Sequence, residues 1–246
     1  MNLWNLEFLR LWRTQRWLIL FAVYGVFGLL GPLTARYLPD LIESIDESAV
    51  GSLPQMTPED GITQYIGNAA QVGLLAIAFV GAAALAFDAN TEMAIYLRTR
   101  ATIREIFTPR FVVTAVAAVG AFAFGMAIAY IGTGILLEWL DLGAVVIGSL
   151  LHAIYLVFAV AVIGLVSSFI RKVPGVALLS VGLLILIALL ALIPAVAPWL
   201  PSELVGAIDV LIRGGEFDFW RSLVMTILLT AVMFGFSVHR LKHREL

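Results

Sequence analysis

The sequence has no cysteine and very few of the side chains that carry catalytic chemistry. Its 246 residues include no cysteine and only 3 histidines. Without cysteine the chain has no disulfide bonds, thiolate metal sites or cysteine nucleophiles. The lysines are Lys172 and Lys242, and neither stands in the Gly-Lys-Ser/Thr loop that binds phosphate. We therefore expect no enzyme activity, cofactor or metal in this chain.

Charged residues are also scarce. They make up 13% of the sequence, whereas hydrophobic residues make up 61%. Most of the chain lies in uncharged runs that reach the length of about 20 helical residues needed to cross a bilayer core. Helices of soluble proteins carry a polar face, which these runs lack. The sequence predicts an all-α polytopic membrane protein with a single transmembrane domain over residues 1–246.

Six runs are predicted to cross the membrane. They cover residues 17–35, 66–87, 111–137, 142–170, 173–197 and 220–238. Six crossings put both termini on one side, and lysine and arginine are enriched in cytoplasmic segments. With cytoplasmic termini, only Arg36, Arg213 and Arg221 of the 15 basic residues lie outside. We therefore predict that both termini are cytoplasmic.

Segments outside the spans have helical patterns of their own. Residues 1–16 predict a helix lying in the membrane interface, with Trp4, Phe8, Leu11 and Trp12 on one face. The alternative is that they form only the first turns of the span at 17–35. Residues 36–61 carry apolar side chains suited to a short surface helix, namely Leu41, Ile42, Ile45 and Ala49.

Two further helix signals lie on the outer side. Thr57 followed by Pro58 and two acidic residues is typical of a helix N-terminus, with Thr57 as the N-cap. Residues 198–219 are semi-apolar and too short to span. They fit a re-entrant or interfacial helix, or alternatively an ordinary amphipathic loop.

A few polar side chains interrupt the spans. His152 is a lone histidine within a span, and such residues deserve a functional hypothesis. No second histidine or buried acid accompanies it, so we expect a hydrogen bond between helices. The candidates for lining a transport pathway are Tyr24, Asn68, Gln71, Tyr130 and His152.

Small residues recur at every fourth position in the second and third spans. The third span carries Ala117, Ala121, Gly125, Ala129 and Thr133. Such stripes let helices approach closely in lipid, where tight packing replaces the hydrophobic driving force. We expect them to pack within the chain.

Residues 88–110 form a charge-dense segment between the second and third spans, on the predicted cytoplasmic side. Its mixed apolar and basic side chains suit contact with another protein. The alternative is a solvated helix whose arginines meet anionic lipid headgroups. The residues expected to make the contact are Glu92, Met93, Tyr96, Leu97, Arg98, Arg100 and Arg104.

This segment resembles the first cytoplasmic loop of permease subunits of type-2 ABC transporters. That loop has a leading acid, a Gly-Thr region, paired leucines, a proline, an arginine-rich turn and a final lysine. Asp88 matches the acid, Thr91-Glu92 the Gly-Thr region, and Tyr96-Leu97 the paired leucines. Arg98 to Arg104 match the basic turn and Arg110 the final lysine, whereas the glycine and the proline are missing.

The resemblance extends to the segment at 1–16, to the segment at 198–219 and to the basic ending SVHRLKHREL. It implies a transmembrane permease subunit in the cytoplasmic membrane of a prokaryote, most simply an exporter. Its expected partners are a second permease subunit, two separate ATPase subunits that bind ATP and Mg²⁺, and membrane lipid, with no nucleic acid. Residues 88–110 would couple the permease to the ATPases.

Two other function classes remain open at this point. An intramembrane enzyme would need a second catalytic group near His152. A stand-alone secondary transporter would need inverted repeats or buried ion-binding acids.

Overall fold

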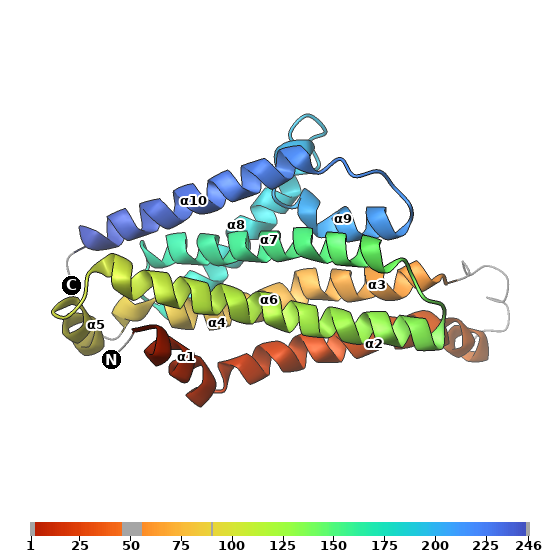
Figure 1. The fold of residues 1–246 in the computed structure, drawn as a ribbon, viewed down its shortest axis with the longest axis horizontal. Coiled ribbons are helices and arrows are strands. Elements are labelled where there is room, and N and C mark those ends of the chain that lie inside the picture. Colours follow the sequence, from red (N-terminus) through yellow and green to blue (C-terminus); the bar gives the residue numbers. More distant parts are fainter. Residues whose placement is uncertain (1–2, 46–55, 90, 245–246) are drawn as a thin grey trace.

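The computed structural model describes residues 3–45, 56–89 and 91–244, which form a helical bundle without strands (Figure 1). The α-helices are α1 (Leu3–Arg13), α2 (Arg16–Ile45), α3 (Pro58–Asn68), α4 (Leu74–Leu85), α5 (Thr91–Arg98), α6 (Ile103–Leu136), α7 (Leu142–Ser167), α8 (Val173–Leu190), α9 (Glu203–Ile212) and α10 (Trp220–Lys242). A π-helical turn, Ala69–Gly73, joins α3 to α4. Short 3₁₀ turns lie at Phe87–Ala89 and Ala197–Trp199.

Within the described residues, six helical segments are long and apolar enough to cross a membrane. They are Arg16–Asp40, Pro58–Leu85, Ile103–Leu136, Leu142–Ser167, Val173–Leu190 and Trp220–Lys242. The second of these combines α3, the π-helical turn and α4. The predicted all-α fold with six spans is confirmed.

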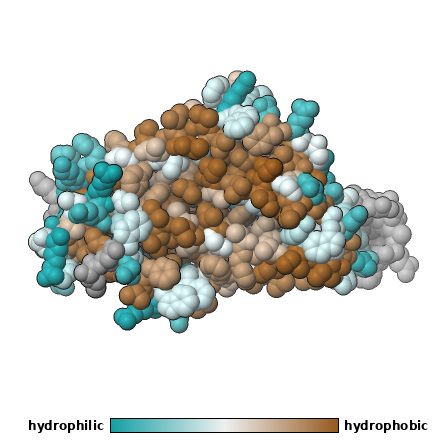
Figure 2. Space-filling model, in the orientation of Figure 1, coloured by the Kyte–Doolittle hydropathy of each residue, from teal (hydrophilic) through white to brown (hydrophobic). Residues whose placement is uncertain are grey.

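The two ends of the bundle differ in the elements they carry. Helices α1 and α5 and the last turns of α10 lie together at one end, which we call the basic end (Figure 1). The loop between α6 and α7 and helix α9 lie toward the opposite end. On the face seen in Figure 2, hydrophobic side chains form a broad band between hydrophilic ends. This banding suits a protein whose middle lies in hydrocarbon.

The N-terminal segment forms a helix separate from the first span. Helix α1 ends at Arg13, and Gln15 adopts a left-handed backbone conformation with φ 54° before α2 begins. The Trp12 ring stacks on the Trp17 ring across this turn, with centroids 4.6 Å apart. The alternative, a mere first turn of the span, is therefore wrong.

Helix α2 is longer than the predicted first span. It runs past Pro39 to Ile45, where we expected the span to end at residue 35 and a separate surface helix to follow. A proline inside a helix removes one hydrogen bond, and long membrane helices tolerate this loss. Ala49, which was expected on the surface helix, lies outside the described residues.

Helix α6 begins eight residues before the predicted third span. The Glu105 carboxylate accepts hydrogen bonds from the Thr102 backbone N–H (2.8 Å) and hydroxyl (2.9 Å). This capping box starts the helix at Ile103. Residues 103–110 are consequently the first turns of a spanning helix, and only α5 and its flanking turns form a separate loop.

Helix α8 ends at Leu190, earlier than the predicted residue 197. Pro194 disfavours helical backbone angles at the residue before it, Ile193, so the helix stops early. At about 1.5 Å per residue, its 18 residues span about 27 Å, close to the thickness of a bilayer core.

Helix α2 packs closely on α6 through glycines. A Cβ atom on Gly28 would collide with the Gly125 carbonyl oxygen, and one on Gly125 would collide with the Tyr24 carbonyl oxygen. Every residue of the stripe from Ala117 to Thr133 is buried. The small-residue stripe of the third span therefore packs within the chain, as predicted.

Helix α7 is the centre of the bundle. It is the most buried of the six spans, whereas α8 and α10 fully bury only a small share of their residues. Helix α9 covers the opposite end of α7 and buries Leu204, Ala207 and Ile208 against it. Residues 198–219 thus contain the predicted helix rather than only a loop.

Candidate functional site at the basic end

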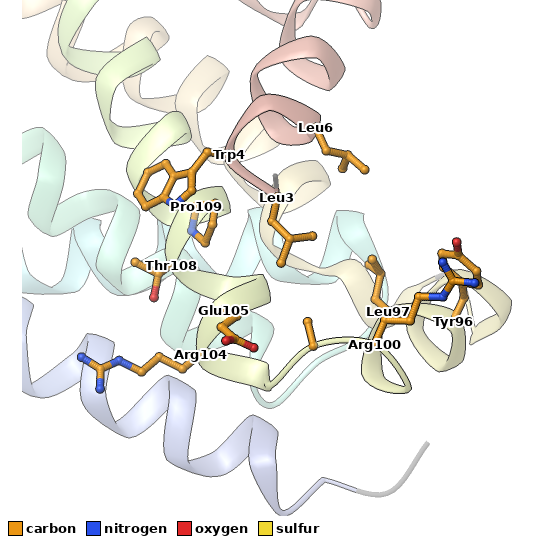
Figure 3. A pocket seen from close by; sticks show the side chains of 11 residues that line it. Leu3, Trp4, Leu6, Tyr96, Leu97, Arg100, Arg104, Glu105, Thr108 and Pro109 are labelled. Carbon is orange, nitrogen blue, oxygen red and sulfur yellow. The ribbon is translucent and has the colours of Figure 1, made fainter. Parts of the chain in front are cut away.

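A cleft of about 710 Å³ opens at the basic end between α1, α5 and the start of α6. Figure 3 shows the side chains that line it. Helix α1 contributes one wall, and the α5–α6 segment contributes the other. The lining residues are Leu3, Trp4, Leu6, Tyr96, Leu97, Arg100, Ala101, Arg104, Glu105, Thr108 and Pro109.

The predicted partner-contact residues fall into three groups. Tyr96, Leu97, Arg100 and Arg104 line the cleft. Glu92 and Met93 lie on the exposed side of α5, outside the cleft lining. Arg98 points into the protein. The structure therefore gathers six of the seven residues on the surface of the basic end or in its cleft, and it places the seventh in an internal ion cluster.

That cluster is centred on Asp88, just after α4. Its buried carboxylate forms an ion pair with the Arg98 guanidinium at 2.9 Å and lies 3.9 Å from the Arg244 guanidinium. Arg98 also donates a hydrogen bond to the Arg244 carbonyl, and Arg244 donates one to the Ser167 carbonyl at the end of α7. Burial lowers the pKa of Arg244, and the Asp88 charge opposes that shift. The cluster fixes α5 to the ends of α4, α7 and α10.

Helix α1 is held by a second buried ion pair. The Arg110 Nε donates a hydrogen bond to the Glu7 carboxylate at 2.9 Å, and both side chains are buried. Arg110 also donates to the Ala84 carbonyl, and Arg16 donates to the Ala83 carbonyl. Both walls of the cleft are thus tied to the spanning helices by charge-assisted hydrogen bonds, the stronger kind.

The charges on the cleft are mainly positive. Arg100 lies over the Tyr96 ring, with its guanidinium carbon 4.5 Å from the ring centroid. Arg104 is exposed and extends from the opposite side of the cleft (Figure 3). The Glu105 carboxylate caps α6 through Thr102, so part of its charge is compensated at the helix N-terminus. The cleft therefore combines apolar side chains with two guanidinium groups at its rims.

The candidate pathway residues do not form one site. Tyr24 and His152 are fully buried and both contact Phe122, with His152 stacked on it at 4.3 Å. Asn68 donates to the Gln64 carbonyl, and Tyr130 donates to the Leu140 carbonyl. Gln71 is exposed on the π-helical turn. Only Tyr24 and His152 are brought together.

His152 does not make the expected hydrogen bond between helices. The Val205 backbone in α9 lies near the ring, but neither ring nitrogen reaches a partner with hydrogen-bond geometry. The imidazole instead lies flat against the Phe122 ring, with an interplanar angle of 12°. Within the described residues, no three metal-binding side chains cluster around this ring or elsewhere.

The sequence did not predict a cluster of ion pairs at the opposite end, which we call the polar clamp. Arg213, after α9, pairs with Asp60 at 2.9 Å and with Asp209 at 3.0 Å. These hydrogen bonds raise the pKa of the Arg213 guanidinium. Asp60 also accepts from the Thr57 backbone N–H (2.8 Å) and hydroxyl (3.1 Å), which supports the predicted helix start at Pro58. The clamp joins α9 to the start of the second span.

Comparison with known proteins gives one full-length similarity, and no family model matches the chain. The chain is 26% identical over 253 residues to the uncharacterized transmembrane protein YxlG of Bacillus subtilis (strain 168). The match covers all of this chain and 98% of the relative. A full-length match to a transmembrane protein agrees with the six apolar helices. The chain is a multi-pass membrane protein.

Proposed function

We propose that this chain is the permease subunit of an ATP-driven transporter of the type-2 ABC kind, working as an exporter. In this proposal the basic end is cytoplasmic. Two separate ATPase subunits, which bind ATP and Mg²⁺, dock there, and a second permease subunit completes the pathway. The membrane-spanning fold, the basic residues at one end and the resemblance of residues 88–110 support it together.

One observation carries the proposal: α5 is a short, largely exposed helix that an ion pair and two buried side chains tie to the bundle. Ala94 and Leu97 anchor its inner face, and Glu92, Met93 and Tyr96 are exposed. The Asp88–Arg98 pair fastens its C-terminal end. In this proposal a displacement of α5 would pull on Asp88 at the end of α4, and through Arg244 on the ends of α7 and α10. That is the property a coupling element requires for rigid-body motion of the spans.

We propose different roles for two arginines. Arg100 is exposed and can contact the ATPase directly, whereas Arg98 holds α5 in place through Asp88. Substitution of Arg98 would therefore uncouple the transporter by loosening α5. Substitution of Arg100 would weaken the contact and leave the helix anchored.

The test is complex formation with an ABC ATPase subunit from the same cell. Glu92→Arg should weaken the complex about tenfold or more, since reversing a charge in a complementary interface brings like charges together, which costs several kcal/mol. Glu138→Arg is the matched control, because Glu138 is exposed in the α6–α7 loop at the opposite end. Affinity is measured on the purified chain in detergent, together with ATP hydrolysis.

We expect the two substitutions to have different effects on affinity and ATP hydrolysis. Glu138→Arg should leave affinity and hydrolysis unchanged. Equal effects at the two ends, or a transport cycle completed by this chain without any ATPase, would overturn the proposal.

A further inference from the structure

The cleft at the basic end has the chemistry of a lipid site, and it shares Arg100 with the contact proposed for the ATPase. Its floor is apolar, with Leu3 and Leu6 from α1 and Leu97 and Pro109 from the other wall (Figure 3). The guanidinium groups of Arg100 and Arg104 lie on opposite sides of the cleft and point away from each other (Figure 3). A molecule that matches both parts has an anionic group joined to an apolar body.

The cleft also lies at the depth where such molecules occur. One wall is α1, whose exposed side chains are mostly apolar and aromatic and include Phe8, Leu9 and Trp12. Arg10 and Arg13 follow in the same helix. A helix of this composition lies at the boundary between headgroups and acyl chains. A cleft beside it therefore opens toward the headgroup layer.

The cleft is preformed. The Glu7–Arg110 pair holds α1 on α6, and the Asp88–Arg98 pair holds α5 on the end of α4. Both pairs lie behind the cleft walls rather than in the cleft. Binding therefore requires little ordering of the protein, and a preorganised site loses less affinity to entropy.

The positive charge of the cleft favours a negatively charged ligand. Glu105 is its one carboxylate, and that group is already engaged by Thr102 at the N-terminus of α6. Neither Arg100 nor Arg104 forms an ion pair with a carboxylate among the described residues. The volume of about 710 Å³ falls within the range of small-molecule sites.

We propose that this cleft binds the headgroup and upper acyl region of one anionic phospholipid from the leaflet in which α1 lies. Arg100 would meet the phosphate at one rim, and Arg104 on the opposite side would add to the attraction of an anionic lipid. The leucines with Trp4 would cover the glycerol and first methylenes. The bound lipid would fill the space between α1 and α5.

The experiment uses the full chain in detergent, and native mass spectrometry counts bound lipid. Dioleoyl phosphatidylglycerol is the probe, and dioleoyl phosphatidylcholine is the neutral comparison. The double variant Arg100→Gln/Arg104→Gln should lose about tenfold or more in phosphatidylglycerol affinity, since each basic side chain contributes to the attraction of anionic lipid. Arg13→Gln/Lys242→Gln is the matched control, because it removes two exposed positive charges from the same end outside the cleft.

A second variant tests the cavity instead of the charge. Ala101→Trp places a large ring in the cleft and keeps both arginines, so it should also reduce the number of bound phosphatidylglycerol molecules by one. Melting temperature checks that each variant is folded.

The remaining outcomes discriminate among occupants. Equal losses in the cleft and control variants would overturn the proposal and leave only diffuse attraction. Displacement of the lipid by soluble glycerol phosphate would also overturn it, because the site would then bind a free phosphate compound. Unchanged lipid binding with lost ATPase binding would assign the cleft to the protein partner. None of these lipid measurements requires an ATPase, so their failure is distinct from failure of the proposed function.

Discussion

At the residue scale, charged side chains buried at the basic end decide how the peripheral helices are held. Glu7 and Arg110 are 103 positions apart in the sequence and meet in the interior, where Arg10 also lies 3.7 Å from the Glu7 carboxylate. Breaking a buried pair leaves an uncompensated charge, which costs far more than losing an exposed pair. Both side chains are therefore needed to hold α1 on α6, and we call this pair the α1 lock.

The first prediction concerns this lock. Glu7→Gln should destabilise the protein by about 3–5 kcal/mol, because the Arg110 charge stays buried without its carboxylate. Asp40→Asn removes the exposed Arg36–Asp40 pair (3.4 Å) and should cost less than about 1 kcal/mol. Thermal unfolding in detergent, followed by tryptophan fluorescence, measures both. Equal losses of stability would contradict a special role for the buried pair.

Individual residues also mark the limit of sequence reasoning. The helix start at Pro58 was predicted, because Thr57 and the acids after it lie next to one another in the chain. Thr102 and Glu105 form the same local pattern, so the start of α6 could have been found too. The Glu7–Arg110 pair could not be predicted, because no local pattern in the sequence indicates which buried arginine a distant glutamate will contact.

At the element scale, close approach of backbones holds α2 to α6. Gly28 and Gly125 face each other so closely that neither position has room for a methyl group. Membrane helices gain little from the hydrophobic effect when they associate, so packing of this kind dominates their contact. The predicted stripe identified the face of α6, although not the partner helix.

The second prediction tests this contact. Gly28→Ala should destabilise the bundle by about 1–3 kcal/mol, because the added methyl group forces two backbones apart. Gly182→Ala in α8 is the matched control, since a Cβ atom there meets no heavy atom within 4 Å. Melting temperatures of the two variants in the same detergent give the comparison. A larger loss for Gly182→Ala would show that the α2–α6 contact is not limiting.

At the scale of the whole molecule, the number of crossings and the distribution of charge fix the topology together. Six spans place α1 and the end of α10 at the same end of the bundle (Figure 1). The basic residues predict that this end is cytoplasmic. Composition alone was enough for the fold class, whereas helix lengths depended on caps and prolines that shift boundaries by several residues.

The third prediction uses the absence of cysteine. Single cysteines introduced by Glu138→Cys and Lys172→Cys give a labelling signal without background. A membrane-impermeant maleimide added to intact cells should label position 138 and leave position 172 unlabelled until the membrane is permeabilised. Both native residues are exposed in loops between helices, so accessibility does not bias the comparison. The reverse pattern would invert the molecule and remove the basis for docking at α5.

The π-helical turn at Ala69–Gly73 gives the second span a means of twisting. Such a turn holds one residue more than an α-helical turn, so the segments on its two sides are rotated by roughly 100° relative to a continuous helix. If the π-helical turn shifts to a neighbouring position, only local backbone hydrogen bonds are exchanged and both ends of the helix stay intact. One end is fastened to Arg213 through Asp60, and the other leads into Asp88 and α5. In the proposed coupling, motion of α5 would therefore pass through this turn before it reaches the end of the span that Arg213 holds.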